Sequence, residues 1–361
     1  MRPVLVLVLA LVPALLSSTV AAAQQPERFQ LRGQEAAVYN LVGAVTIEPG
    51  TGELAVEVTR TGRDGGQLKV EQGEVRGGEA LRVIYPADNI LVPAMGAGSS
   101  TTLRVREDGT FGEGDWDGDR RHRDRDDGGR RVEIRGSGSG LDAGADLRIR
   151  VPTGRQLAVY LAVGKVSLAN VQGEIRVDAS SAPVTATGVK GELTVDVGSG
   201  TVRVTDGEGV LNVDTGSGSV EVSRFKGRDL TVDTGSGNVN GTELTAEGLS
   251  IETGSGDIEV AGVSSPSLSL ETGSGTVRAD LRTDIRSLSV ETGSGDVAVT
   301  APATLDAEVE IETSSGDIES DFPLQVTRHA RDHLVGRIGA GKGRIAVETG
   351  SGDVRLIKRP G

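Results

Sequence analysis

A glycine-rich motif that recurs at near-constant spacing restricts this chain to a repeat architecture. One copy is Val290–Val299, "VETGSGDVAV", and the copies are centred on Ser199, Ser217, Ser236, Ser255, Ser274, Ser294, Ser315 and Ser351. The gaps between these serines are 18, 19, 19, 19, 20, 21 and 36 residues, and two degenerate copies precede them around Val163 and Ser181. Self-similarity near 20 residues is typical of a solenoid, in which each repeat is one coil stacked on the next.

Within a copy, apolar and polar residues alternate, which predicts β-strands rather than helices. In "LSIETGSGDIEV" one face carries Leu249, Ile251, Ile258 and Val260, and the other carries Ser250, Glu252, Asp257 and Glu259. Each coil is therefore predicted to be a strand, a Gly-Ser-Gly turn, a second strand and a looser return. Glycine suits such a turn because it adopts positive φ without a Cβ clash. The turn glycines are Gly216, Gly218, Gly235, Gly237, Gly254, Gly256, Gly273, Gly275, Gly293, Gly295, Gly350 and Gly352.

One coil cannot offset the entropy of ordering its own backbone, so the coils must stack and pair their strands with those above and below. The predicted fold is all-β, a single-chain parallel β-solenoid similar to a β-helix, with coils of about 18–21 residues. A right-handed coil is expected by analogy with other parallel β-helices.

Stacking in register would turn sequence positions into columns along the solenoid. One position is acidic in nearly every coil: Asp178, Asp196, Asp214, Asp233, Glu252, Glu271, Glu291, Glu312 and Glu348. Like charges directly opposed across strands are destabilising, so these carboxylates are expected to splay into solvent, pair with basic side chains or share cations. The next position is occupied by Thr215, Thr234, Thr253, Thr272, Thr292, Thr313 and Thr349, whose hydroxyls are expected to hydrogen-bond turn backbone from coil to coil.

The chain divides into four segments. Residues 1–23, with a basic start, an apolar run and a small-residue end, are typical of a secretory signal peptide. Residues 24–106 alternate well and include "YNLVGAV" (39–45), which matches "YLAVGKV" (160–166), so they are predicted to form an N-terminal β segment or cap coils. Residues 107–131 have the mixed charge of a flexible insertion. Residues 132–361 are predicted to form the main array, with an irregular capping coil near the C-terminal end.

Composition restricts where the protein is expected to be located and which partners it is expected to bind. No later segment is long and apolar enough to span a bilayer, so the protein is predicted to be exported to the periplasm, cell surface or extracellular space. The formal net charge of −14 disfavours nucleic acid and anionic membranes as partners. The chain contains no cysteine, which excludes a disulfide scaffold and a cysteine nucleophile.

Calcium is the one cofactor that the motif suggests, because calcium-binding β-rolls also contain repeats rich in glycine and aspartate. The candidates that follow a turn are Asp257, Asp296, Asp317 and Asp353. Other coils carry Thr201, Ser219, Asn238 or Thr276 at this position, and an inconstant ligand favours a turn-capping role. A second set, Asp115, Asp117 and Asp119, has the alternate spacing of a calcium loop but lacks its glycine at position six and its glutamate at position twelve. No metal site is therefore assigned.

Catalysis has weak support in these residues. The only imidazoles are His122, His329 and His333, and the last two could share a metal only on a helix, without an evident third ligand. A polysaccharide-acting enzyme needs a distinctive carboxylate pair, and 2% aromatic residues leave little surface for sugar stacking. The Gly-Ser-Gly turn joins strand to strand and is followed by no lysine of a phosphate-binding loop.

The tandem [DE]-T-G-S-G-[DTSN]-[VI] motif, the lead-in "LRIRVPTG" and the ending "VGRIGAGKGRIAVETGSGDVRL" resemble the bacterial "putative adhesin" family, a domain of unknown function in exported proteins. The resemblance covers about residues 30–360 except the charged insertion. It implies a β-solenoid-like fold and a surface or envelope role, and it supplies no catalytic residues. The predicted function is a non-catalytic, adhesin-like structural or interaction protein that presents a rigid acidic surface to a protein or glycan at the cell envelope or host surface. A calcium-stabilised binding repeat and a polysaccharide-acting β-helix enzyme remain alternatives.

Overall fold

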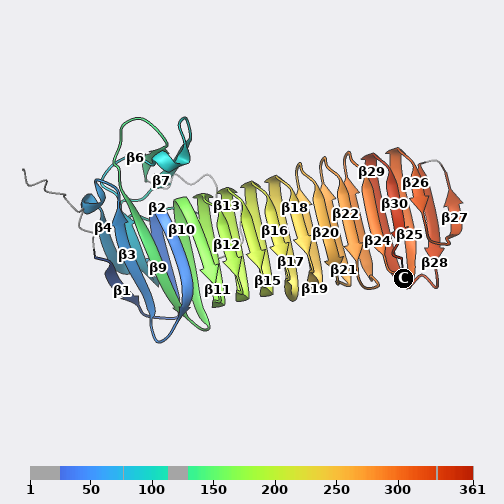
Figure 1. Cartoon of the computed structure of the whole chain (residues 1–361), viewed down its shortest axis with the longest axis horizontal. Helices are drawn as coiled ribbons and strands as arrows, with labels where there is room; N and C mark the ends of the chain where they lie inside the picture. Colours follow the sequence, from blue (N-terminus) through green and yellow to red (C-terminus); the bar gives the residue numbers. More distant parts are fainter. Residues whose placement is uncertain (1–24, 76, 113–128, 331, 361) are drawn as a thin grey trace, which may run out of the picture.

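The structure is a computed structural model that describes residues 25–75, 77–112, 129–330 and 332–360. These residues form an elongated stack of strands that cross the long axis of the molecule (Figure 1). Hydrogen bonds link 27 strands into one continuous, mostly parallel sheet. Two short 3-10 turns, η1 (Gly65–Gln67) and η2 (Pro93–Met95), are the helical elements of the described chain. The predicted all-β class is confirmed.

Each regular coil contributes one long and one short strand, which the Gly-Ser-Gly turn separates. The long strands are β11 (Gln172–Ser181), β13 (Lys190–Ser199), β15 (Glu208–Ser217), β17 (Lys226–Ser236), β19 (Thr245–Thr253), β21 (Ser267–Thr272), β23 (Ser287–Thr292), β25 (Ala307–Ser315) and β29 (Gly343–Ser351). The short strands are β12 (Val184–Thr187), β14 (Val202–Thr205), β16 (Val220–Ser223), β18 (Val239–Thr242), β20 (Ile258–Val263), β22 (Val277–Leu281), β24 (Val297–Ala301), β26 (Ile318–Ser320) and β30 (Val354–Lys358).

Long strands pair in parallel with long strands, and short strands pair with short strands, so the stack has two rows. Leu249 of β19 lies opposite Leu268 of β21, and Ile258 of β20 lies opposite Val277 of β22. Parallel in-register pairing between successive coils defines a β-solenoid. The predicted architecture is therefore confirmed, while the hand of the coil stays a prediction.

The core is one continuous aliphatic cluster that runs along the stack. Leu249, Ile251, Ile258 and Val260 are each no more than 3% exposed. Glu252, between two of these positions, is exposed. The two-residue period of the sequence is thus the inside–outside alternation of the coil.

At the N-terminal end, two strands run without interruption through both rows: β2 (Glu35–Gly50) and β10 (Arg155–Ala169). The matching segments 39–45 and 160–166 pair in register, and the rings of Tyr39 and Tyr160 stack at a centroid distance of 4.5 Å. Beyond β2, the first row continues with β5 (Gly78–Ile84) and β4 (Lys69–Val75). The second row continues with β9 (Gly144–Pro152), β3 (Leu54–Thr61) and β1 (Glu27–Leu31).

Antiparallel pairing enters at this end: β1 with β3, β3 with β9, and β4 with β5. A small separate sheet of β6 (Asn89–Leu91), β8 (Arg130–Arg135) and β7 (Ser100–Val105) lies beside the stack (Figure 1). Within the predicted charged insertion, Phe111 is 5% exposed and contacts Tyr39 edge-on at 6.0 Å. Residues 113–128 of that insertion lie outside the described residues.

At the C-terminal end, the coils do not stack in chain order. The last coil, β29–β30, pairs on one side with β23–β24 and on the other side with β25–β26. The stack ends with an antiparallel hairpin of β27 (Gln325–His329) and β28 (His333–Ile338), which pairs with β25 (Figure 1). Strands β25 to β28 thus lie outside the coil that follows them in sequence, an order that the repeat spacing does not predict.

Candidate functional site

The Gly-Ser-Gly corner is built by two glycines with different constraints. The second glycine has positive φ, from +142° at Gly200 to +158° at Gly275. At Gly256 (φ +146°), an added Cβ would also lie 2.2 Å from the carbonyl oxygen of Gly237 in the preceding coil. The first glycine, such as Gly254, is not among the positive-φ residues, but its Cβ would lie 2.5 Å from the Gly235 oxygen. Close stacking of the corners therefore favours glycine at both positions, although Ser314 fills the first position in the coil of β25, and Ser180 and Ala182 fill the two positions in the coil of β11.

The aspartates that follow the corner link one coil to the next. The backbone N–H of Thr276 donates to Asp257 Oδ1 at 2.8 Å, and the N–H of Asp353 donates to Asp296 Oδ1 at 3.0 Å. The N–H of Asp317 donates in turn to Asp353 Oδ1 at 3.0 Å, and Asn238 Oδ1 receives the N–H of Asp257. One oxygen of each accepting carboxylate thus accepts a hydrogen bond from the backbone. The amide oxygen of neutral Asn238 accepts the equivalent hydrogen bond.

A column of buried threonines lies immediately before the corner. Thr253, Thr272, Thr292 and Thr349 are at most 5% exposed. Each hydroxyl donates to the carbonyl oxygen of a corner glycine in the adjacent coil, for example Thr272 Oγ1 to Gly256 O at 3.0 Å. Thr215 occupies the same column, but its buried hydroxyl has no hydrogen-bond partner. These bonds satisfy corner carbonyls that the sheet leaves unpaired.

The acidic residues of the repeat form a continuous column on the outer face of the long strands. We call this set the acidic column; its order in space is Asp178, Asp196, Asp214, Asp233, Glu252, Glu271, Glu291, Glu348 and Glu312. Its side chains range from half-buried Asp178 to exposed Glu271. Two positions before some of these carboxylates the residue is small, such as Ser250 or Ser269, whereas Arg176, Asn212 and Glu310 occupy this position in β11, β15 and β25.

On neighbouring surfaces of the stack, acidic side chains form ion pairs with basic ones. On the short strands, Arg203 donates to both carboxylate oxygens of Glu221 at 2.8 and 2.9 Å. This hydrogen-bonded guanidinium holds the pKa of Glu221 below its usual value. At the second corner of the coil, which follows each short strand, Arg224 binds Asp206 in the same bidentate way and lowers the pKa of that carboxyl.

The second corner also contains a residue of positive φ in successive coils, which the sequence does not reveal. Asn170, Asp206, Arg224 and Glu243 all have positive φ, between +52° and +55°. Glycine fills the equivalent place at Gly188 (φ +65°). Because the residue type varies from coil to coil, no motif marks this corner, although Asn and Asp are among the residues that tolerate this conformation.

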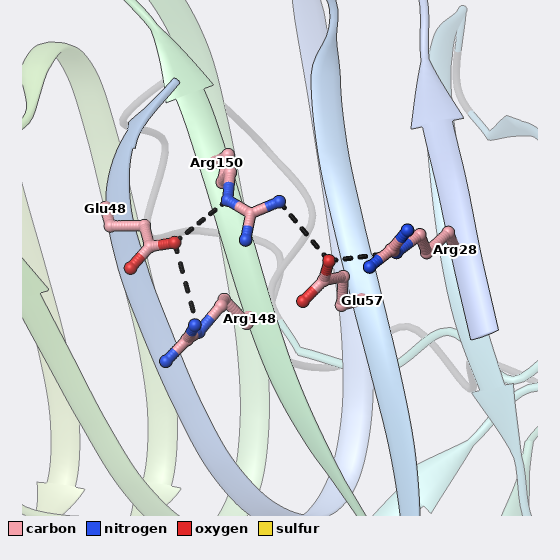
Figure 2. A network of polar contacts seen from close by, with 5 residues as sticks. All are labelled: Arg28, Glu48, Glu57, Arg148 and Arg150. Atoms are coloured by element: carbon pink, nitrogen blue, oxygen red, sulfur yellow. Dashed lines mark hydrogen bonds and ion pairs between the residues drawn. The ribbon is translucent and has the colours of Figure 1, made fainter. Parts of the chain in front are cut away.

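The N-terminal cap carries a charge network across its strands (Figure 2). Glu57 of β3 forms ion pairs with Arg28 at 3.0 Å and with Arg150 at 3.3 Å. Glu48 of β2 forms an ion pair with Arg150 at 3.0 Å and lies 3.9 Å from Arg148. These hydrogen bonds and charges raise the pKa of Arg150. An open groove of about 650 Å³ lies beside this network. Opposite charges on adjacent strands stabilise their pairing, so the network joins the antiparallel cap to the parallel stack.

The remaining candidates are separated from the corners. Asp115, Asp117, Asp119 and His122 lie outside the described residues. His329 and His333 are on the two strands of the terminal hairpin rather than on a helix. His333 lies opposite Glu312 at the end of the acidic column, a neighbour that sequence spacing could not reveal.

These features define a class: a two-row parallel β-solenoid with glycine corners and an acidic outer column. Residues 145–357, more than half of the chain, match the family described as Toastrack DUF4097, and the chain belongs to this family. The resemblance predicted from the repeats is thereby confirmed, whereas residues 30–144 lie outside the matched range.

Two solved structures share features with this chain at low similarity. One is a "putative cell adhesion protein" from Clostridium sporogenes, with 10% identity, a TM-score of 0.19, and coverage of 93% of this chain and 100% of that one. The other is a "putative adhesin" from Bacteroides fragilis, with 11% identity, a TM-score of 0.35, and coverage of 92% and 96%. Comparison with curated proteins gives no match. Within the described ranges, no helix is long and apolar enough to cross a membrane.

Proposed function

We propose that this protein is a non-catalytic, exported interaction module of the cell envelope or surface. Its acidic column would bind a protein or glycan partner that carries basic groups. The observation that supports this proposal is the in-register alignment of nine carboxylates along one face of the stack.

The rigidity of the stack supports the same proposal. Every carboxylate of the acidic column is attached to a strand that pairs with a strand on each side, from β11 between β10 and β13 to β25 between β29 and β28. A preorganised surface loses little conformational entropy when it binds. The electrostatic field of a negatively charged surface also increases the association rate with a positively charged partner and makes binding sensitive to salt.

The calcium alternative gains no support from the corners. Asp257, Asp296 and Asp353 already use an oxygen to accept a backbone N–H from the adjacent coil. Neutral Asn238 fills the same role. We therefore propose a structural role for these aspartates, and we expect no shift of several degrees between thermal melts in EDTA and in millimolar calcium.

Binding to immobilised envelope glycans and host matrix proteins tests the proposed function. The test variant neutralises three members of the acidic column: Asp233→Asn, Glu252→Gln and Glu271→Gln. The matched control removes three exposed carboxylates elsewhere: Glu192→Gln, Glu247→Gln and Glu259→Gln.

Because both variants change the net charge equally, only a surface-specific interaction distinguishes them. We expect the column variant to lose at least tenfold in affinity and the control to bind like the wild type. Equal losses in both variants, or no binding by the wild type to any member of the panel, would contradict the proposal.

Export has its own test. Residues 1–23 lie outside the described residues, and their role as a signal peptide rests on the sequence. We expect the protein in an envelope or culture fraction to begin at about Gln24. A chain that retains residues 1–23 in the cytoplasm would contradict the proposal.

A further inference from the structure

The acidic column ends against a histidine. Glu291, Glu348 and Glu312 follow one another in parallel register, and the next strand, antiparallel β28, places His333 opposite Glu312. Glu310 is two residues from Glu312 on the same face of β25. One donor atom from each of Glu310, Glu312 and His333 lies within 4.8 Å of the other two.

The separations suit a shared ion. His333 Nε2 lies 3.4 Å from Glu312 Oε1 and 3.9 Å from Glu310 Oε1. Ligands at about 2.1 Å from a tetrahedral zinc ion are about 3.4 Å from each other. Of the two edges at the histidine, the one to Glu312 already has this length, and the one to Glu310 needs a movement of about half an ångström, which a glutamate side chain on an open face can make. The donor oxygens of Glu310 and Glu312 lie within 4.8 Å of each other.

The histidine nitrogen also lacks another partner. Nε2 of His333 is buried and makes no hydrogen bond, although the side chain as a whole is 19% exposed. Buried polar nitrogens in folded proteins are normally hydrogen-bonded or bound to a metal. The nitrogen faces two carboxylate oxygens, and a cation between these three atoms would satisfy all of them.

Surrounding contacts orient Glu310 and the backbone beside His333. Arg344 donates to Glu310 Oε2 at 2.9 Å, while Oε1 of the same carboxylate is the oxygen nearest His333. The backbone around His333 is anchored by the N–H of Thr313, which donates to Asp332 O at 2.9 Å. Such outer contacts orient metal ligands in characterised sites.

We propose that Glu310, Glu312 and His333 form a binding site for a divalent transition metal ion, with Zn²⁺ as the best match. An imidazole nitrogen favours zinc and its neighbours in the first transition row, whereas calcium and magnesium take oxygen ligands. Three protein ligands leave one position for water or for a donor atom from outside. The ion joins β28 to β25 and thus fastens the terminal hairpin to the outermost coil.

Titration of the purified full chain with Zn²⁺ alone, followed by calorimetry, tests the site. The test variant is His333→Gln, and the matched control is His329→Gln, which changes the other histidine of the hairpin. We expect one Zn²⁺ per chain, at least a tenfold weaker Kd in His333→Gln, and an unchanged Kd in His329→Gln. Equal affinity in all three proteins, or binding of Ca²⁺ as tight as that of Zn²⁺, would overturn the proposal.

Hydrogen exchange locates the ion independently of these substitutions. Saturating Zn²⁺ is expected to slow exchange of backbone amides in β25 and β28 at least threefold and to leave β15 and β17, in the middle of the acidic column, unchanged. Protection spread evenly along the column would show diffuse binding to carboxylates and would refute a discrete site. If His333→Gln were misfolded, Glu312→Gln with the same exchange readout would decide between the two outcomes.

Discussion

The threonine column permits a prediction in which the same substitution has opposite effects at two positions. Thr272 and Thr215 are each 1% exposed, but only Thr272 donates to a glycine carbonyl, at 3.0 Å. Replacing Thr272 by valine removes a net contribution of about 1–2 kcal/mol to the free energy of unfolding. Replacing Thr215 by valine removes a buried hydroxyl without a partner, which is expected to stabilise the fold by about 1 kcal/mol. A valine fits there, because fully buried Val197 lies in register with Thr215 in the adjacent coil.

Urea unfolding followed by circular dichroism measures both effects, and Thr253→Val repeats the hydrogen-bonded case at 3.1 Å. We expect the free energies of unfolding of Thr272→Val and Thr215→Val to differ by about 2–3 kcal/mol at an unchanged slope with denaturant. Equal destabilisation in the two variants would refute the claim that the hydroxyl–carbonyl bond, rather than side-chain shape, determines threonine at this position.

Three further predictions concern the core, the corner and the surface. Ile258→Asp places a charge at a fully buried position, so we expect a loss of more than about 4 kcal/mol and a lower melting temperature by circular dichroism. Gly256→Ala is expected to lower the free energy of unfolding by about 3 kcal/mol more than Gly154→Ala. Both glycines have positive φ, but only an alanine at 256 would place its Cβ 2.2 Å from a backbone oxygen. Similar unfolding midpoints for the two variants would contradict this. Because Arg203 lowers the pKa of Glu221, their pairing stabilises the fold above pH 4.5 and is lost as the pH falls through the lowered value. The urea midpoints of wild type and Arg203→Gln should therefore differ at pH 7 and converge at pH 3.

The regular part of the fold could be predicted because its local and global signals agree. The two-residue alternation around Ile258 sets the inward face, and the recurring Gly-Ser-Gly sets where the strand bends. Together these patterns define both the strand and its register with the next coil. The match between 39–45 and 160–166 likewise corresponds to strands that pair in the structure.

The order of the last coils could not be predicted because two coils carry nearly the same motif. "IETSSGDI" of β25 and "VETGSGDV" of β29 offer the same alternation, and either could pair with β23. Only the structure shows that β29 takes that place. The position of His333 depends on this end of the fold, since an antiparallel strand brings it opposite Glu312, which lies 21 positions earlier in the chain.

The positive-φ position of the second corner could not be predicted from the sequence for a different reason. Its positive-φ position accepts Asn170, Asp206, Arg224 and Glu243, so no residue type marks it. A single left-handed residue costs an ordinary side chain about 1–2 kcal/mol, which the surrounding pairing can offset. Sequence patterns report such positions only when glycine is required by contact as well as by conformation.

The interleaved C-terminal coil has a consequence for the time course of folding. Most neighbouring coils join residues 18–20 apart, but the backbone N–H of Asp353 reaches Asp296 across 57 residues. Strands β25 to β28 therefore cannot take their final place until the chain that follows them has been synthesised and has paired with β23–β24. Contacts of larger sequence separation form more slowly, so we expect the array to propagate readily through its regular coils and to complete its C-terminal end as a separate, slower step. A chain that emerges N-terminus first would carry an open strand edge at β23 and β24 until β29 and β30 have been synthesised.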